Sequence, residues 1–129
     1  MPAAISCVTF PVDDLQKSVG FYQNALGLTV EEQDEDSAIF DVDGISLTLM
    51  QRSEFGTYVE RLGHRPAARG AAEMILSYFT ESKGEVDALM AQVQRAGGQV
   101  VAASDDDGVY SGYFTDPDGH TWEVLFDGE

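Results

Sequence analysis

Phe114-Thr-Asp-Pro-Asp-Gly-His-Thr-Trp-Glu-Val-Leu-Phe126 is the stretch from which the fold of this chain can be worked out. It opens with a turn, because proline pre-sets the backbone at the second turn position and Gly119 accepts a positive φ. The residues after the turn alternate between two faces, which is typical of a strand. One face is bulky and apolar: Trp122, Val124 and Phe126. Glu123 falls on the opposite face, between Thr121 and Leu125, so that face carries a carboxylate that a simple core would not need.

Composition predicts one globular domain over residues 1–129. A chain of 129 residues is long enough for a sizeable core but short for two independent ones. Its hydrophobic fraction of 43% is ordinary. No apolar run approaches the ~20 residues that a membrane-spanning helix needs. The single cysteine, Cys7, forms no intramolecular disulfide and suits a reducing cytoplasm, so we expect a cytoplasmic protein.

The formal net charge of −16 indicates which partners to expect. Such a field repels phosphate backbones and anionic membrane surfaces, so we expect neither nucleic acid nor membrane as a partner. The negative charge has two possible explanations. It keeps the protein soluble, or it adapts a groove to a cationic ligand. Positive charge is concentrated in one central stretch, at Arg52, Arg61, Arg65 and Arg69.

The first half of the chain reads as strand, helix and three strands. Residues 5–12 alternate as a strand, and Asp13 or Asp14 then caps a helix that ends at Gly27. Its apolar stripe includes Tyr22, whose hydroxyl we expect to reach water or a partner. Three strands are predicted next, at 28–32, 38–42 and 45–51, with Asp43-Gly44 as a hairpin turn.

The second half repeats this order. A connector, 52–71, holds a short helix and then several glycine and proline residues. A strand at 73–79 precedes a helix that ends at Gly97-Gly98. The remaining elements are a strand at 99–102, a polar loop at 104–108, and strands at 109–115 and 120–126. We therefore predict an α+β fold of tandem βαβββ modules, 1–51 and 72–129, forming a curved mixed sheet around a shared cavity.

Two motifs carry a resemblance to a known family. The opening Val8-Thr-Phe-Pro-Val-Asp-Asp-Leu-Gln-Lys-Ser-Val-Gly-Phe-Tyr22 and the closing Phe114-x-Asp-Pro-Asp-Gly-His-x-Trp-Glu-Val124 resemble the vicinal oxygen chelate superfamily. That superfamily comprises glyoxalase I, bleomycin-resistance proteins, fosfomycin-resistance enzymes and extradiol dioxygenases. The middle stretch, from Thr80 to Leu89, is similar to the bacterial subgroup labelled predicted lactoylglutathione lyase. The resemblance covers nearly the whole chain and implies fold more specifically than reaction.

The resemblance also implies where a metal would be held. The family's ligand positions, chiefly His and Glu, correspond here to Cys7, Thr48, Glu73 and Glu123. Only Glu123 matches the family outright, and Thr48 is a weak neutral donor, so we expect no cofactor, with a divalent metal as the alternative. We interpret His64 and His120 as surface or turn residues and Cys7 as a buried, inert thiol.

The candidate site follows from these positions. Glu123 and Glu73 are the candidate acid–base residues, and they would share a proton if they approached one another. Residues expected to bind a ligand are Cys7, Thr9, Thr48, Ser77, Tyr110 and Glu123. Aromatic residues expected in the core are Phe10, Tyr22, Tyr78 and Trp122. Four other aromatic residues are less constrained and could line the mouth of a pocket: Tyr58, Tyr110, Tyr113 and Phe55.

Three functions fit this reading, in order of preference. The first is a glyoxalase-like protein that binds a small organic molecule in the inter-module cavity, acting as a lyase or isomerase if it is an enzyme. The second is a non-enzymatic protein that sequesters a cationic drug or metabolite, and the third is a metal-dependent lyase or dioxygenase. The resemblance further implies a homodimer.

Overall fold

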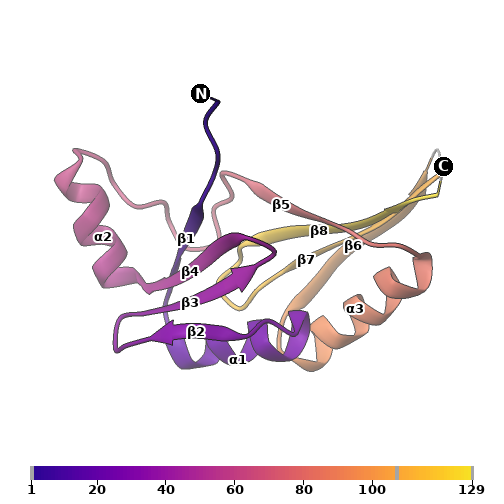
Figure 1. Ribbon diagram of the computed structural model, residues 1–129, viewed down its shortest axis with the longest axis horizontal. Helices are drawn as coiled ribbons and strands as arrows, with labels where there is room; N and C mark the ends of the chain where they lie inside the picture. Colours follow the sequence, from indigo (N-terminus) through magenta and orange to yellow (C-terminus); the bar gives the residue numbers. More distant parts are fainter. Residues whose placement is uncertain (1, 107, 129) are drawn as a thin grey trace.

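The computed structural model describes residues 2–106 and 108–128, which form eleven elements (Figure 1). The first module contains β1 (Cys7–Val12), α1 (Leu15–Leu26), β2 (Val30–Gln33), β3 (Ser37–Val42) and β4 (Ile45–Gln51). After α2 (Arg52–Arg61), the second module contains β5 (Ile75–Phe79), α3 (Lys83–Arg95), β6 (Gln99–Asp106), β7 (Val109–Thr115) and β8 (Thr121–Asp127). This order confirms the predicted α+β fold with tandem βαβββ modules.

The two modules build four-stranded sheets of the same design. Their strand orders are β1-β4-β3-β2 and β5-β8-β7-β6. In each sheet the first and last strands of the module run parallel, and the other neighbours are antiparallel. Figure 1 shows α1 and α3 along one side of the molecule, while α2 stands apart at the end where the N-terminal module lies. Each sheet therefore has one face covered by a helix and one face open.

Local sequence signals explain where the helices begin and end. The Asp14 side chain accepts a hydrogen bond from the Lys17 backbone N–H, and Ser82 caps α3 in the same way through Glu85. Gly27 adopts a left-handed φ of 66° directly after α1, where a side chain would be strained. Among the described residues, no helix is long and apolar enough to cross a membrane.

One continuous core joins the two modules. Phe21 of α1 is 1% exposed and packs against Gly98, where an added Cβ would lie 2.5 Å from a Phe21 ring carbon. A larger residue at 98 would therefore push α1 away from the start of β6. Phe114 and Trp122 stack in the second module, with ring centroids 5.9 Å apart. The apolar face of β8 lies in this core, as its alternation predicted.

Sequence expectations about several segments were wrong. The strand β5 begins at Ile75 rather than at 73. Residues 104–106, expected in a polar loop, continue β6, because Ser104 and Asp105 pair with β7 and the edge position leaves their side chains in water. Tyr78, expected in the core, is 44% exposed, because β5 is an edge strand and α3 packs on β6, β7 and β8 instead.

Candidate functional site

Glu123 lies on the open face of the second sheet, bonded to two hydroxyl groups. Its carboxylate accepts hydrogen bonds from Ser77 Oγ at 2.9 Å and from the Tyr113 hydroxyl at 2.7 Å. The strand register sets this group, because both partners lie directly opposite Glu123 on its two neighbouring strands. The bond to Glu123 raises the pKa of Tyr113, so the phenol stays protonated and continues to donate.

Tyr110, which was expected at the ligand, lies on the other side of this sheet. Its hydroxyl donates to Asp87 of α3, and Lys83 lies over its ring. Tyr110 pairs with Phe126 in the register, whereas Tyr113 pairs with Glu123. Residues three apart in a strand point to opposite faces, so alternation identifies Tyr113 as the companion of Glu123.

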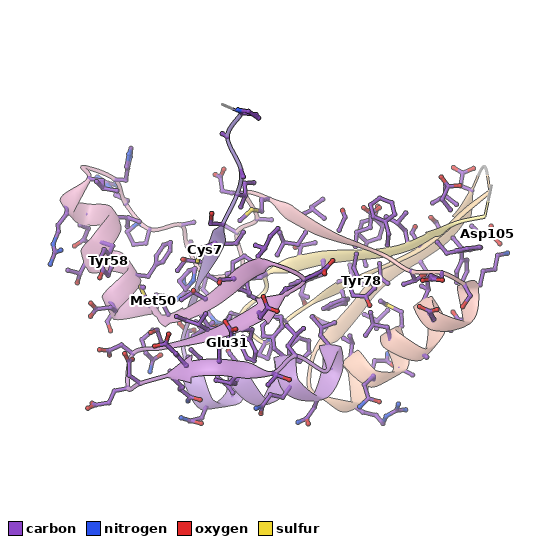
Figure 2. The ribbon with its side chains drawn as sticks, in the orientation of Figure 1. Cys7, Glu31, Met50, Tyr58, Tyr78 and Asp105 are labelled. Carbon is purple, nitrogen blue, oxygen red and sulfur yellow. The ribbon has the colours of Figure 1, made fainter. Side chains whose placement is uncertain are left out.

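A second polar group lies on the open face of the first sheet. Cys7 Sγ is 3.3 Å from Thr48 Oγ1 and 3.8 Å from Thr9 Oγ1. Thr9 and Thr48 are direct partners on β1 and β4, so the structure brings these three predicted residues together. Figure 2 shows Cys7 near the start of β1. Cys7 is exposed, which corrects the expectation of a buried thiol, because it is the first residue of β1 and lies at the end of the strand.

A cavity with a volume of about 480 Å³ lies at the junction between the modules. Its walls come from β1, α2, the segment after α2 and the start of β8. Of the predicted site residues, Thr9 and Glu73 line it, whereas Glu123 does not. Apolar side chains supply much of the surface: Phe10, Pro11, Phe55, Val59, Pro66, Ala67, Ala71, Ala72 and Met74. A volume of this size is within the range of small-molecule sites.

Both histidines of the chain line this cavity. His120 is half-buried: its ring stacks on Phe10 with centroids 4.3 Å apart, and Nε2 is 2.7 Å from the Pro11 carbonyl oxygen. Its backbone N–H donates to Asp116 at 2.9 Å. His120 therefore closes the turn, as one of the two expectations had it, and its half-buried ring also forms a wall of the cavity. His64 is exposed at the same cavity.

Two carboxylates and two guanidinium groups hold the outer wall of the cavity in place. Arg52 and Arg69 each approach Asp13 to 2.6 Å and Asp118 to 3.8 Å. Asp118 is 4% exposed and also accepts from the Asp13 backbone N–H at 2.8 Å and Ser18 Oγ at 3.0 Å. Both ends of segment 52–69 are thereby bound to the start of α1 and to the turn before β8. We call this group of Asp13, Asp118, Arg52 and Arg69 the clasp.

The hydrogen bond to Arg52 is the largest reason that the pKa of Asp13 lies below its ordinary value. The carboxylate therefore stays ionised and keeps its attraction for both arginines. Sequence reasoning missed the clasp, because Asp118 was interpreted only as a turn former. The available signal was the presence of four arginines between the modules of a strongly acidic chain.

A buried polar network lies next to the clasp. Tyr22 is completely buried, its hydroxyl donates to Asp116 at 2.6 Å, and it accepts a bond from Trp122 Nε1 at 3.1 Å. Burial raises the pKa of Asp116 and is also the largest cause of the raised pKa of Tyr22. The hydroxyl thus reaches a partner, as expected, and that partner is a buried carboxylate. The network joins α1 of the first module to β8 of the second.

In the described part of the chain, the positions of the family's metal ligands do not gather around one point. A catalytic divalent site generally needs three good donors around one point. Among residues 2–106 and 108–128, no three His, Cys, Asp or Glu side chains lie close enough to hold an ion. Cys7 and Thr48 share one sheet face, Glu73 lines the cavity and Glu123 lies on the other sheet. Of the two candidate acid–base residues, Glu73 lines the cavity, whereas Glu123 is bonded to Ser77 and Tyr113 and does not line it.

Comparisons with known proteins establish the family. The model of the Glyoxalase/Bleomycin resistance protein/Dioxygenase superfamily matches residues 4–124, so the chain belongs to this superfamily. The chain is 29% identical over 122 residues to the metallothiol transferase FosB of Lysinibacillus sphaericus, covering 93% of this chain and 79% of that protein.

Solved structures share the fold. A glyoxalase-related enzyme from Fulvimarina pelagi superposes with a TM-score of 0.84 at 25% identity, covering 98% of this chain and 95% of the other. A lactoylglutathione lyase from Agrobacterium tumefaciens superposes with a TM-score of 0.75 at 24% identity, with 98% and 95% covered. At that identity the second likeness concerns the fold alone.

Proposed function

We propose that this protein binds a small organic molecule in the cavity between its modules. The cavity itself carries the proposal, because it is of ligand size and combines apolar walls with a few polar groups. Its outer wall is held by the clasp, and His120 is held by Phe10 and Pro11. A preorganised site loses less entropy when a ligand binds. The single cysteine supports action in a reducing compartment such as the cytoplasm.

If the protein is an enzyme, the residues support lyase or isomerase chemistry without the family's usual complete metal site. Glu73 is the carboxylate that lines the cavity, so it is the candidate general base for an acidic C–H bond of the ligand. Glu123, with Tyr113 as a proton donor beside it, is the second acid–base candidate on the open sheet face.

Filling the cavity tests its role. A panel of small aromatic compounds with neutral, acidic and basic head groups is screened by calorimetry. We expect binding by the native chain and at least a tenfold loss in Ala72→Trp, because the indole occupies volume that the ligand needs. Ala88→Trp is the matched control, since Ala88 is an exposed alanine that lines a different hollow, on α3. Equal binding by both variants would remove the cavity from the proposal.

Non-enzymatic sequestration is the second candidate function. Glu73 offers a cavity carboxylate to a cationic ligand. A bound compound recovered chemically unchanged after prolonged incubation supports sequestration, whereas turnover that disappears in Glu73→Gln supports the enzyme.

We further propose that a second copy of the chain covers the open face of the second sheet. Several large apolar residues on β5 and its flank are uncovered: Met74, Ile75 and Phe79 are 51%, 55% and 72% exposed. Ile75 and Phe79 share their face with Ser77 and Glu123 by alternation. Contiguous exposed apolar surface of this kind marks interaction sites. A homodimer would bring a partner against Glu123.

A charged side chain introduced on this face should dissociate the proposed homodimer. We expect light scattering to give twice the chain mass of 14.0 kDa for the native protein and a single chain mass for Phe79→Glu. In the dimer, the introduced carboxylate would be buried in the interface without a partner. In the monomer, position 79 is exposed, so the substitution costs little stability. Leu62→Glu, at a 73% exposed position after α2, is the control and should stay dimeric. A native protein of single chain mass would contradict the homodimer.

A further inference from the structure

The cavity is lined by two opposite charges that are not paired. Arg65 and Glu73 both line it and both are exposed, so they stand where the cavity meets solvent. Within residues 2–106 and 108–128, neither side chain forms an ion pair, with the other or with anything else. Each charged group is therefore available to a ligand.

Arg65 stands out among the arginines of its segment. Arg52 and Arg69 are both committed to Asp13 in the clasp, and Arg61 lies over the Tyr58 ring at 5.6 Å. Figure 2 shows Tyr58 on α2, at the end of the molecule that carries the cavity. In a chain of net charge −16, a guanidinium without an acidic partner at a cavity is an unusual local charge. It favours a ligand with an anionic group.

Glu73 sets the opposite requirement at the same cavity. A ligand with a single negative charge would satisfy Arg65 but would be repelled by the Glu73 carboxylate. A ligand with a single positive charge would satisfy Glu73 and be repelled by Arg65. A ligand with both charges satisfies both residues, because guanidinium binds carboxylate through two parallel hydrogen bonds and a carboxylate accepts from an ammonium group.

We infer that the ligand of this cavity is a small zwitterion with an apolar body, of the chemical class of a hydrophobic α-amino acid. This inference rests on the proposed function and names the ligand class of the same site. Arg65 binds the carboxylate, Glu73 binds the ammonium group, and the apolar body lies against Phe55 and its neighbours. Burial of that body supplies affinity, and the two charges supply selectivity.

Four matched probes test the inference by isothermal titration calorimetry. They are L-phenylalanine, 3-phenylpropanoate, 2-phenylethylamine and 2-phenylethanol, which share a phenylethyl body and differ in their charges. We expect L-phenylalanine to bind about tenfold more tightly than either singly charged probe. In Arg65→Gln, L-phenylalanine should no longer bind more tightly than 2-phenylethylamine. In Glu73→Gln, it should no longer bind more tightly than 3-phenylpropanoate. Arg95→Gln and Glu35→Gln change exposed charges outside the cavity and should leave the ranking unchanged.

The outcomes separate this inference from the proposed function. Binding of all four probes with equal affinity overturns the zwitterion and leaves small-molecule binding intact. The inference is also overturned if 3-phenylpropanoate binds as tightly as L-phenylalanine and Glu73→Gln has no effect. The same holds if 2-phenylethylamine binds as tightly as L-phenylalanine and Arg65→Gln has no effect. Failure of every probe to bind, the neutral one included, overturns both the inference and the proposed cavity function.

Discussion

Tyr22→Phe should lower the free energy of unfolding by about 2–4 kcal/mol, although the substitution removes only one oxygen atom. The Tyr22 side chain is completely buried, and its hydroxyl is bonded to both Asp116 and Trp122. Without it, a buried carboxylate oxygen and a buried indole N–H both lose a partner, at about 1–3 kcal/mol each. Urea unfolding followed by Trp122 fluorescence at pH 7 measures the change.

Tyr110→Phe is the matched control. It also deletes a phenol that donates to an aspartate, but the bond from Tyr110 to Asp87 is exposed to water. Water replaces the lost partner there, so we expect a loss below about 0.5 kcal/mol. Similar losses in the two variants would show that the buried network does not stabilise the junction between the modules.

The penalty of Tyr22→Phe should also depend on pH. Burial raises the pKa of Asp116 above its ordinary value of 3.8, so ionisation of Asp116 disfavours the folded state, and stability falls as pH rises through the folded pKa. The Tyr22 hydroxyl opposes this effect by lowering the pKa. Its removal raises the pKa of Asp116 further, so the penalty should be larger at pH 7 than at pH 4. An equal penalty at both values would contradict the assignment of the hydroxyl as a partner of ionised Asp116.

The fold was predictable because each element carries its own local signal. The Asp43-Gly44 turn has φ values of 52° and 93°, which is the pattern that its residues favour. The alternation of β8 placed its apolar residues in the core and Glu123 on the open face, as the structure has them. Such signals span a few residues and need no tertiary information.

The site was only partly predictable because it depends on register and on distant contacts. Ser77 lies opposite Glu123 because β5 and β8 pair in one particular register, which neither strand encodes alone. Glu73 falls before that strand begins and joins the cavity instead. The partners of Asp118 come from residues about a hundred positions earlier in the chain. A turn motif predicts its own backbone but not which side chains fold onto it.

Asp118→Ala should cost about 2–4 kcal/mol and also loosen the outer wall of the cavity. The substitution leaves the Asp13 backbone N–H and Ser18 Oγ without an acceptor, and it removes a buried charge that faces two arginines. Segment 52–69 would then be held mainly through Asp13, which is more exposed. Trypsin should cleave this segment faster under native conditions at the Arg61–Leu62 bond.

Asp105→Ala is the control for Asp118→Ala, because it removes an ion pair that is not part of the clasp. Asp105 binds Lys83 at 3.2 Å with both side chains 57% exposed, and Figure 2 places it at the end of the molecule opposite α2. An exposed pair contributes below about 1 kcal/mol, so stability and cleavage after Arg61 should stay close to native. If Asp118→Ala left cleavage unchanged while lowering stability, the clasp would hold the modules together without holding the cavity wall. Faster cleavage together with weaker binding of the cavity ligand would connect the Pro-Asp-Gly turn to function, because a side chain carried on this turn would also hold the wall against which the ligand lies.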